Sequence, residues 1–282
     1  NSATLLDAAG NNAIITHALQ NLANDNVDTT APTVTTIAGS GSATIHNAGD
    51  NIDVTLTFSE AVTLSNATDA QIQLNIGGAV VNAAHFGAVS GTSLTIRAAV
   101  TAGQNDADGV EVVANSLSLL NAATLRAAAG NNATLTHAIQ NLANDSVDTT
   151  APTAPTFSPT DDSTNVAVGS NLTLTFAEPI AVGTGNITLT DTTDGSSTVS
   201  IPIGDAQVVI SGNTVTINPT TDLETATAYA VQVAATAITD LAGNAFAGIA
   251  DNTTWNFTTA AAAINEIEVR GGTPAVAILS GD

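Results

Sequence analysis

One short segment of this chain places oxygen-bearing side chains in a spacing that suits a hard cation. Residues 105–109 read NDADG, with Asp106 and Asp108 at alternate positions before Gly109. Calcium ions bind carboxylate, amide and carbonyl oxygens, and the pattern is like the first half of an EF-hand loop. The bidentate glutamate of that loop is absent at its spacing, and Asp, Asn and Gly also form ordinary turns. The segment is therefore either part of a calcium site or a plain turn.

The sequence contains no comparable motif for catalysis. A catalytic site needs a nucleophile, or an acid and a base, held by converging groups in a pocket. The sequence offers no G-x-S-x-G motif, no histidine with a flanking acid motif and no glycine loop of phosphate-binding type. We predict that the histidines (His17, His46, His85 and His137) are half-buried structural residues and that Trp255 fills a core. We expect no enzymatic activity.

The elements that must position these residues are organised as a repeat. Residues 1–33 match residues 121–153 at 26 of 33 positions, 120 positions apart. Repetition at a fixed period is typical of an array of similar units. We therefore interpret residues 1–27 as the closing strands of a truncated preceding repeat, 28–147 as a complete domain, 148–260 as a second domain, and 261–282 as the start of a further, truncated β-domain.

Hydrophobic residues alternate with polar ones through most of both complete units. Residues 51–58 (NIDVTLTF) have this period of two, which indicates a half-buried strand. Similar segments are QIQLNI, SLTI, SLSL and TLTHAI in the first unit, and NLTLTF, NITLT, VVI, TVTI, YAVQV and TWNF in the second. Many short strands between turn-forming clusters predict an all-β fold of tandem Ig-like antiparallel β-sandwiches. The alanine-rich stretches leave room for one helical turn at 18–24 and its copy at 138–144.

The joints between units share the sequence DTTAPT, at residues 28–33 and 148–153. Pro32 and Pro152 fix their own φ and hold the preceding residue extended, which makes a short, stiff joint. Domains joined in this way cannot tumble freely. We expect an extended rod.

The composition excludes several classes of partner. The chain has 25 Asp and Glu residues against 3 Lys and Arg, a formal net charge of −22. Binding to phosphate backbones or to anionic membranes needs clustered positive charge, so we expect no nucleic-acid partner and no direct membrane insertion in this segment. With 44% hydrophobic and only 10% charged residues, the chain can offset its conformational entropy and fold. It has no cysteine, and hence no disulfide or thiolate metal site.

These motifs together resemble a known family. The series DTTAPTV, AGDNIDVTLTFSEAV, VTAGQNDADGVEVVANSLSL and AAGNNATLTH resembles the bacterial Ig-like repeats of giant secreted adhesins. The second unit, with VAVGSNLTLTFAEPI, TDLETATAYAV, ITDLAGNAFAG and NTTWNFTT, is similar to the bacterial Ig-like domain of surface-layer-type proteins. The resemblance implies an extracellular or cell-surface location and a spacer role.

The resemblance also implies structural calcium at the joints between domains, and the chain has oxygen ligands there. The candidate metal ligands are Asp28, Glu60, Asp106 and Asp108 in the first unit and Asp148, Glu178, Asp240 and Asn244 in the second. Asp7 of the segment DAAGN is replaced by Ala127 in its repeat copy, so that copy has lost a carboxylate. The alternative is that all these residues only form turns.

We therefore expect a structural spacer of a secreted bacterial adhesin or extracellular fibre, which extends a distal domain from the cell. Its partners would be neighbouring repeats of the same protein and other copies in a fibre. A second hypothesis is a subunit of a head-to-tail filament, in which strands of the incomplete terminal domains add to the sheets of neighbouring subunits. A third is a carbohydrate- or protein-binding module, which should display clustered exposed aromatic residues.

Overall fold

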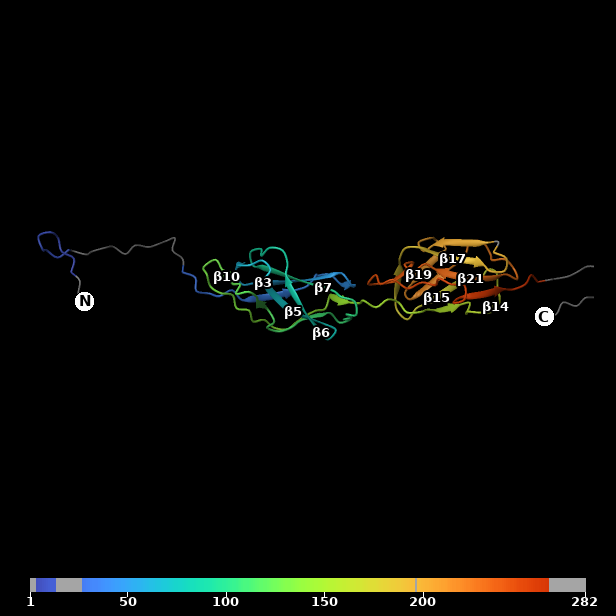
Figure 1. Ribbon diagram of the computed structural model, residues 1–282, viewed down its shortest axis with the longest axis horizontal. Helices are drawn as coiled ribbons and strands as arrows, with labels where there is room; N and C mark the ends of the chain where they lie inside the picture. The colour runs from blue at the N-terminus through green and yellow to red at the C-terminus, as the bar shows by residue number, and fades with distance from the viewer. Residues whose placement is uncertain (1–3, 14–26, 196, 264–282) are drawn as a thin grey trace, which may run out of the picture.

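The computed structural model describes residues 4–13, 27–195 and 197–263, and within them it forms two β-sandwiches. Figure 1 shows the two sandwiches following one another along the long axis of the molecule, joined by a short linker. Every regular element in these ranges is a strand. This confirms the prediction of an all-β fold with tandem sandwiches in an extended arrangement. The described residues contain no helix long and apolar enough to span a membrane.

The first sandwich is made of twelve strands. They are β1 (Val34–Ala38), β2 (Thr44–His46), β3 (Asn51–Phe58), β4 (Val62–Leu64), β5 (Ala70–Ile76), β6 (Ala79–His85), β7 (Ser93–Ala99), β8 (Val110–Val112), β9 (Ser118–Leu119), β10 (Leu125–Ala127), β11 (Gln140–Leu142) and β12 (Asp145–Val147). Its main sheet has the order β1-β3-β7-β6-β5-β8-β11, with β9 also paired to β5. Two small sheets, β10-β4 and the parallel pair β12-β2, complete it.

Strand β6 lets this one sheet form both layers. It pairs with β5 along almost its whole length, but with β7 only through Ala84 and His85. The sheet turns a corner there, and the apolar sides of β3 and β5 belong to one core. Along β3, Ile52, Val54 and Leu56 have no exposed surface, while Asp53 and Thr55 between them are partly exposed. The predicted alternation of residues 51–58 is confirmed.

The second sandwich is made of the remaining strands. They are β13 (Thr156–Ser158), β14 (Ser163–Val166), β15 (Leu172–Thr175), β16 (Ile180–Val182), β17 (Asn186–Asp191), β18 (Thr198–Pro202), β19 (Val208–Ser211), β20 (Thr214–Ile217), β21 (Ala228–Val233), β22 (Ile238–Asp240) and β23 (Asn256–Thr259). They form a four-stranded sheet, β13-β15-β20-β19, and a five-stranded sheet, β14-β23-β21-β17-β18. The pair β16-β22 is separate, and β14 runs parallel to β23.

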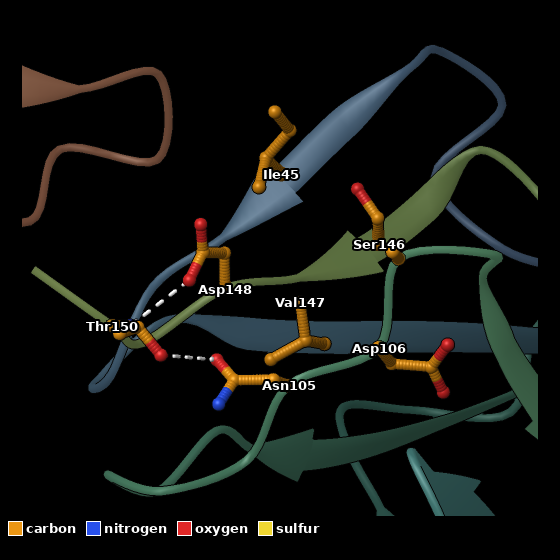
Figure 2. Close-up of a pocket in the computed structure, with 8 residues that line it drawn as sticks. Ile45, Asn105, Asp106, Ser146, Val147, Asp148 and Thr150 are labelled. Atoms are coloured by element: carbon orange, nitrogen blue, oxygen red, sulfur yellow. Dashed lines mark hydrogen bonds between the residues drawn. The ribbon is translucent and has the colours of Figure 1, made fainter. Parts of the chain in front are cut away.

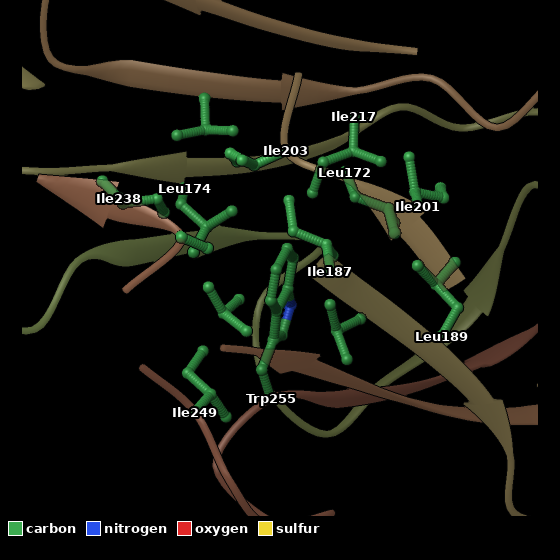
Figure 3. Packing of buried hydrophobic residues seen from close by; sticks show 14 of the residues in the cluster. Leu172, Leu174, Ile187, Leu189, Ile201, Ile203, Ile217, Ile238, Ile249 and Trp255 are labelled. Atoms are coloured by element: carbon green, nitrogen blue, oxygen red, sulfur yellow. The ribbon is translucent and has the colours of Figure 1, made fainter. Parts of the chain in front are cut away.

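Trp255 lies at the centre of the second core, as predicted (Figure 3). The side chain is fully buried, and its ring is stacked on Phe157 at 4.8 Å between centroids. The indole Nε1 donates a hydrogen bond of 2.9 Å to the carbonyl of Pro159, which satisfies its polar atom inside the core.

Two expectations for residues 134–144 are wrong. The segment TLTHAI is not a strand, because Thr134 makes only an isolated bridge to Thr33 and β11 begins at Gln140. In this segment, side-chain hydrogen bonds take the place of the backbone hydrogen bonds between paired strands. The backbone N–H of His137 donates to the Asn115 side chain, and its Nε2 accepts from the N–H of Leu117. The helical turn expected at 138–144 is also absent, because β11 and the turn after it occupy those residues. Its copy at 18–24 lies outside the described residues.

Candidate functional site

The linker between the sandwiches is fastened to the first one by the NDADG segment. The Asn105 side-chain oxygen accepts hydrogen bonds from the N–H of Thr149 (2.8 Å) and from the hydroxyl of Thr150 (3.2 Å). The N–H of Asp148 donates to the carbonyl of His46 at the end of β2 (3.0 Å). The linker is therefore held by side chains and backbone of the first domain, in addition to its prolines.

Asp106 and Asp108 belong to this loop, and neither joins the other predicted ligands in a group of three acidic side chains. Asp106 is buried, accepts a hydrogen bond from the N–H of Gly77 (2.7 Å) and exchanges two backbone hydrogen bonds with Val147. Its Oδ1 is buried and has no hydrogen-bond partner among the described residues. Asp106 and Asp148 both line a hollow of about 560 Å³ between these segments. Figure 2 shows the two residues on different segments, with the Asp106 carboxylate pointing away from Asp148. Asp108 is exposed.

Three of the predicted ligands converge at the start of the second sandwich. Asp148 of the linker, Glu178 between β15 and β16, and Asp240 at the end of β22 each bring a carboxylate oxygen within 4.8 Å of the others. No other such group of three exists in the parts of the chain that the structure describes. We call these residues the joint cluster. Asp240 is buried and the other two are half-buried.

The turn after β22 orients one member of the cluster. In the segment DLAGN (240–244), the two carboxylate oxygens of Asp240 accept from the backbone N–H (2.9 Å) and the side-chain amide (2.8 Å) of Asn244. The same amide donates to the carbonyl of Asp148 at 2.9 Å. Gly243 has φ = 90°, in the left-handed region that favours glycine. The predicted ligand Asn244 thus acts as a donor that ties the linker to the second sandwich.

Among the described residues, the joint cluster concentrates negative charge without an arginine beside it. Burial raises the pKa of Glu178 above its usual value, and the charges of Asp240 and Asp148 raise this pKa further. The two described arginines lie elsewhere: Arg97 is paired with Asp53 at 2.6 Å, and Arg126 donates to the Asn132 side chain at 2.7 Å. The arrangement offers three oxygen ligands of the kind that a divalent hard cation prefers.

The joint before the first sandwich has the same backbone plan but fewer carboxylates. The side-chain amide of Asn131 donates to the carbonyl of Asp28 at 3.0 Å, as that of Asn244 does to Asp148. The position equivalent to Asp240 is Ala127, which is buried. Asp28 is exposed and its Oδ1 caps the N–H of Thr30, while Glu60 is half-buried. Among the described residues, Asp28 and Glu60 belong to no cluster of three acidic ligands.

Residues 5–13 form a third copy of this turn. The N–H of Asp7 donates to the carbonyl of Asn11 at 2.9 Å, as the N–H of Ala127 does to that of Asn131. Both oxygens of Asp7 accept hydrogen bonds from Asn11, as those of Asp240 do from Asn244. These bonds lower the pKa of Asp7.

Sequence reasoning missed a buried contact between a histidine and an aspartate. His46 Nε2 lies 3.0 Å from Asp145 Oδ1, and both side chains are more than 90% buried. Asp145 Oδ2 also accepts from the N–H of Ser40. The two residues are 99 positions apart, and only the recurrence of Asp145 as Asp25 hinted at its importance. Because the pair is enclosed in the fold, its geometry is that of a structural contact between β2 and β12.

The other described histidines are structural as well. His137 is hydrogen-bonded through both ring nitrogens, and it is buried where the prediction was half-buried. His85 is buried, with Nδ1 bonded to the carbonyl of Ala67 and Nε2 without a partner among the described residues. His17 lies outside the described residues.

Comparisons with known families and solved structures give one family match, which covers the second unit. Residues 148–259 match the family of the bacterial Ig-like domain. Among solved structures, the chain is similar to fibronectin(III)-like modules of CbhA from Clostridium thermocellum, with 12% identity, a TM-score of 0.23, and coverage of 84% of this chain and 100% of that one. A putative membrane anchored protein from Corynebacterium diphtheriae has 13% identity and a TM-score of 0.21, and the match covers 89% of this chain and 63% of that one. No curated protein sequence matches significantly.

Proposed function

We propose that this segment is a structural spacer of an extracellular or cell-surface bacterial protein, in which successive sandwiches hold a distal domain away from the cell. The observation that carries the proposal is the attachment of the linker on both sides. Asp148 donates its N–H to His46 of the first sandwich, and its carbonyl accepts from Asn244 of the second. A linker held at one residue by both domains restricts their relative rotation, which is what a spacer needs.

The chemistry of the surface also favours a spacer over a binding module. Recognition of sugars or proteins usually relies on exposed aromatic side chains. In the described residues Trp255 and Phe157 are stacked in the core, Tyr229 is buried against Phe257, and Phe86, which is 48% exposed, is covered on one face by Arg97.

We propose further that the joint cluster holds a calcium ion. The residues present fit such an ion, because three carboxylates lie close together with no described arginine beside them, and their like charges repel one another. Asp148, Glu178 and Asp240 would be its ligands, and Asn244 would keep Asp240 in place. A bound divalent cation would neutralise the cluster and stiffen the joint.

Small-angle scattering on the full chain tests the spacer proposal. We expect an extended particle whose maximum dimension shrinks and whose flexibility increases when Asn105→Ala and Asn244→Ala release the linker on both sides. Asn186→Ala is the matched control, because Asn186 bonds to Ser200 within the second sandwich. If the double variant scatters like the parent chain, the linker attachment does not set the shape.

Calcium binding is tested separately by isothermal titration calorimetry, in which calcium chloride is added to protein that a chelator has freed of divalent ions. We expect binding by the parent chain and its loss in Glu178→Gln, while Glu60→Gln keeps it. Absence of binding in the parent chain would contradict the calcium proposal and leave the spacer proposal standing.

A further inference from the structure

The dipeptide Asp-Gly occurs twice in this chain, at residues 108–109 and 194–195. In such a dipeptide the backbone nitrogen of the glycine can attack the side-chain carbonyl carbon of the aspartate, because glycine has no Cβ to obstruct the approach. The main chain must rotate to bring these two atoms together. Whether each dipeptide reacts therefore depends on the room that the fold leaves around it.

The first Asp-Gly is enclosed by the chain that follows β11. Gly109 is buried and has φ = 99°, and a Cβ placed on it would lie 2.6 Å from both the Cα of Ala143 and the carbonyl oxygen of Leu142. The next residue, Val110, begins β8 and pairs with Leu142. Rotation of the main chain at Gly109 would have to break these contacts, so this dipeptide reacts only after a local opening of the fold.

The second Asp-Gly lies in the turn of the hairpin that joins β17 to β18. Asp194 and Gly195 are both exposed. No atom of the described residues, apart from those of its two chain neighbours, lies within 4 Å of a Cβ placed on Gly195. Below the tip, the hairpin is fixed by the β17–β18 ladder and by the hydrogen bond from the N–H of Asp191 to the carbonyl of Ser197 (2.9 Å). The tip can therefore change its shape while the hairpin stays paired.

We propose that Asp194 is a site of spontaneous isomerisation to isoaspartate, and that the fold protects Asp108 from the same reaction. The nitrogen of Gly195 forms a bond to Cγ of Asp194 and gives up its proton, and one carboxyl oxygen leaves as water, which yields a five-membered succinimide. Water then adds to one of the two ring carbonyl carbons. Where it breaks the bond between the nitrogen and the backbone carbonyl carbon, the main chain runs through the side chain, and the product is isoaspartate of unchanged mass.

The two positions differ in what the modification would damage. Isoaspartate lengthens the main chain by one methylene group. At Asp108 this change would displace the loop in which Asn105 holds the linker through the N–H of Thr149. At Asp194 the added group lies beyond the hydrogen bond that closes the hairpin. The modification can therefore accumulate while the joint and the second core stay intact, and the inference does not depend on the spacer or calcium proposals.

Peptide mapping of the incubated full chain tests the proposal. The chain is kept near neutral pH for several weeks and digested, and electron-transfer fragmentation of the separated peptides distinguishes isoaspartate from aspartate at each position. In the folded chain, we expect isoaspartate from Asp194 to exceed that from Asp108 by about tenfold or more. In concentrated urea, where neither segment is folded, we expect the two positions to react at similar rates.

Two variants of the same residue serve as controls. Asp194→Glu keeps the charge, but its longer side chain would have to close a six-membered ring, so the isomer should disappear from this peptide. Asp194→Asn should form the same succinimide faster by losing ammonia, and should therefore deamidate in the folded chain.

Three results would overturn the proposal. The first is equal isoaspartate at the two positions of the folded chain, and the second is a ratio that urea leaves unchanged. The third is an Asp194→Asn chain that keeps its asparagine, because the tip could then not form the ring. None of these results bears on the linker attachment or on calcium binding.

Discussion

The side-chain amide of Asn244 donates a hydrogen bond to the carbonyl of Asp148, and Asn131 makes the same bond to Asp28 one domain earlier. In each sandwich, an asparagine in a turn near the C-terminal end of the domain thus binds the linker that precedes the domain. The plan is a property of the repeat and not of one joint, although the acidic residues around it differ.

Removing this grip should weaken the second sandwich. Asn244→Ala loses the bonds to Asp148 and to the Asp240 carboxylate, and we expect the free energy of unfolding to fall by about 1 to 3 kcal/mol. Urea unfolding followed by Trp255 fluorescence measures it, because the chain has one tryptophan and it lies in the second core. Asn131→Ala alters the first sandwich and should leave this transition unchanged; an equal shift would contradict the assignment.

Glu178 should destabilise the second sandwich at neutral pH when divalent cations are absent. Its pKa is raised in the folded state by burial and by Asp240 and Asp148. The folded chain then binds more protons than the unfolded chain just above pH 4.5, the ordinary value, so stability falls as the pH rises through that window. Glu178→Gln should remove this fall and melt at a higher temperature at pH 7 in chelator. A variant that melts no higher than the parent would show that the carboxylates do not repel one another.

The opposite pH dependence is expected from Asp251. Hydrogen bonds from the backbone and side chains of Thr253 and Thr254 lower its pKa from 3.8 to about 2. Its contribution to stability is present above pH 3.8 and is lost as the pH falls through about 2. Asp251→Asn should reduce the loss of stability of the second sandwich in this acid range, measured by Trp255 fluorescence. Asp222→Asn, an exposed carboxylate of the same sandwich, is the control for a general charge effect.

Ala127→Asp should give the first joint the carboxylate that its repeat relatives have. The new charge would stand in the turn that contacts Asp28, and we expect a loss of about 1 to 3 kcal/mol for the first sandwich in chelator. If calcium binds the joint cluster, added calcium should restore stability in this variant more than in the parent chain. Calorimetry of the full chain records it, with Ala127→Asn as the uncharged control. A variant as stable as the parent in chelator would contradict the expected repulsion.

The sequence predicted what depends on local pattern. The alternation in residues 51–58 identified β3 because each apolar side chain of that run faces the core. The segment 134–139 misled, because His137 is anchored by side-chain hydrogen bonds and not by a strand partner. Alternation alone cannot distinguish these cases.

The residue types of the candidate site can be predicted from the sequence, but the contacts between distant segments cannot. The family resemblance implies calcium ligands at the joints, and the structure brings the candidates Asp148, Glu178, Asp240 and Asn244 together at one of them. Asp106 is of a residue type that binds calcium, but its loop lies beneath the linker. Its carboxylate accepts a hydrogen bond from the backbone N–H of Gly77 instead. The His46–Asp145 pair depends on two strands far apart in the chain, and no spacing rule indicates such a contact.

The parallel pairing of β2 with β12, and of β14 with β23, decides how the chain responds to tension. In each sandwich one strand of the pair lies near the start of the domain and the other near its end. Pulling on the two termini therefore drags the paired strands past each other along their length. The hydrogen bonds of each pair are then loaded together in shear and do not open one after another like a zipper.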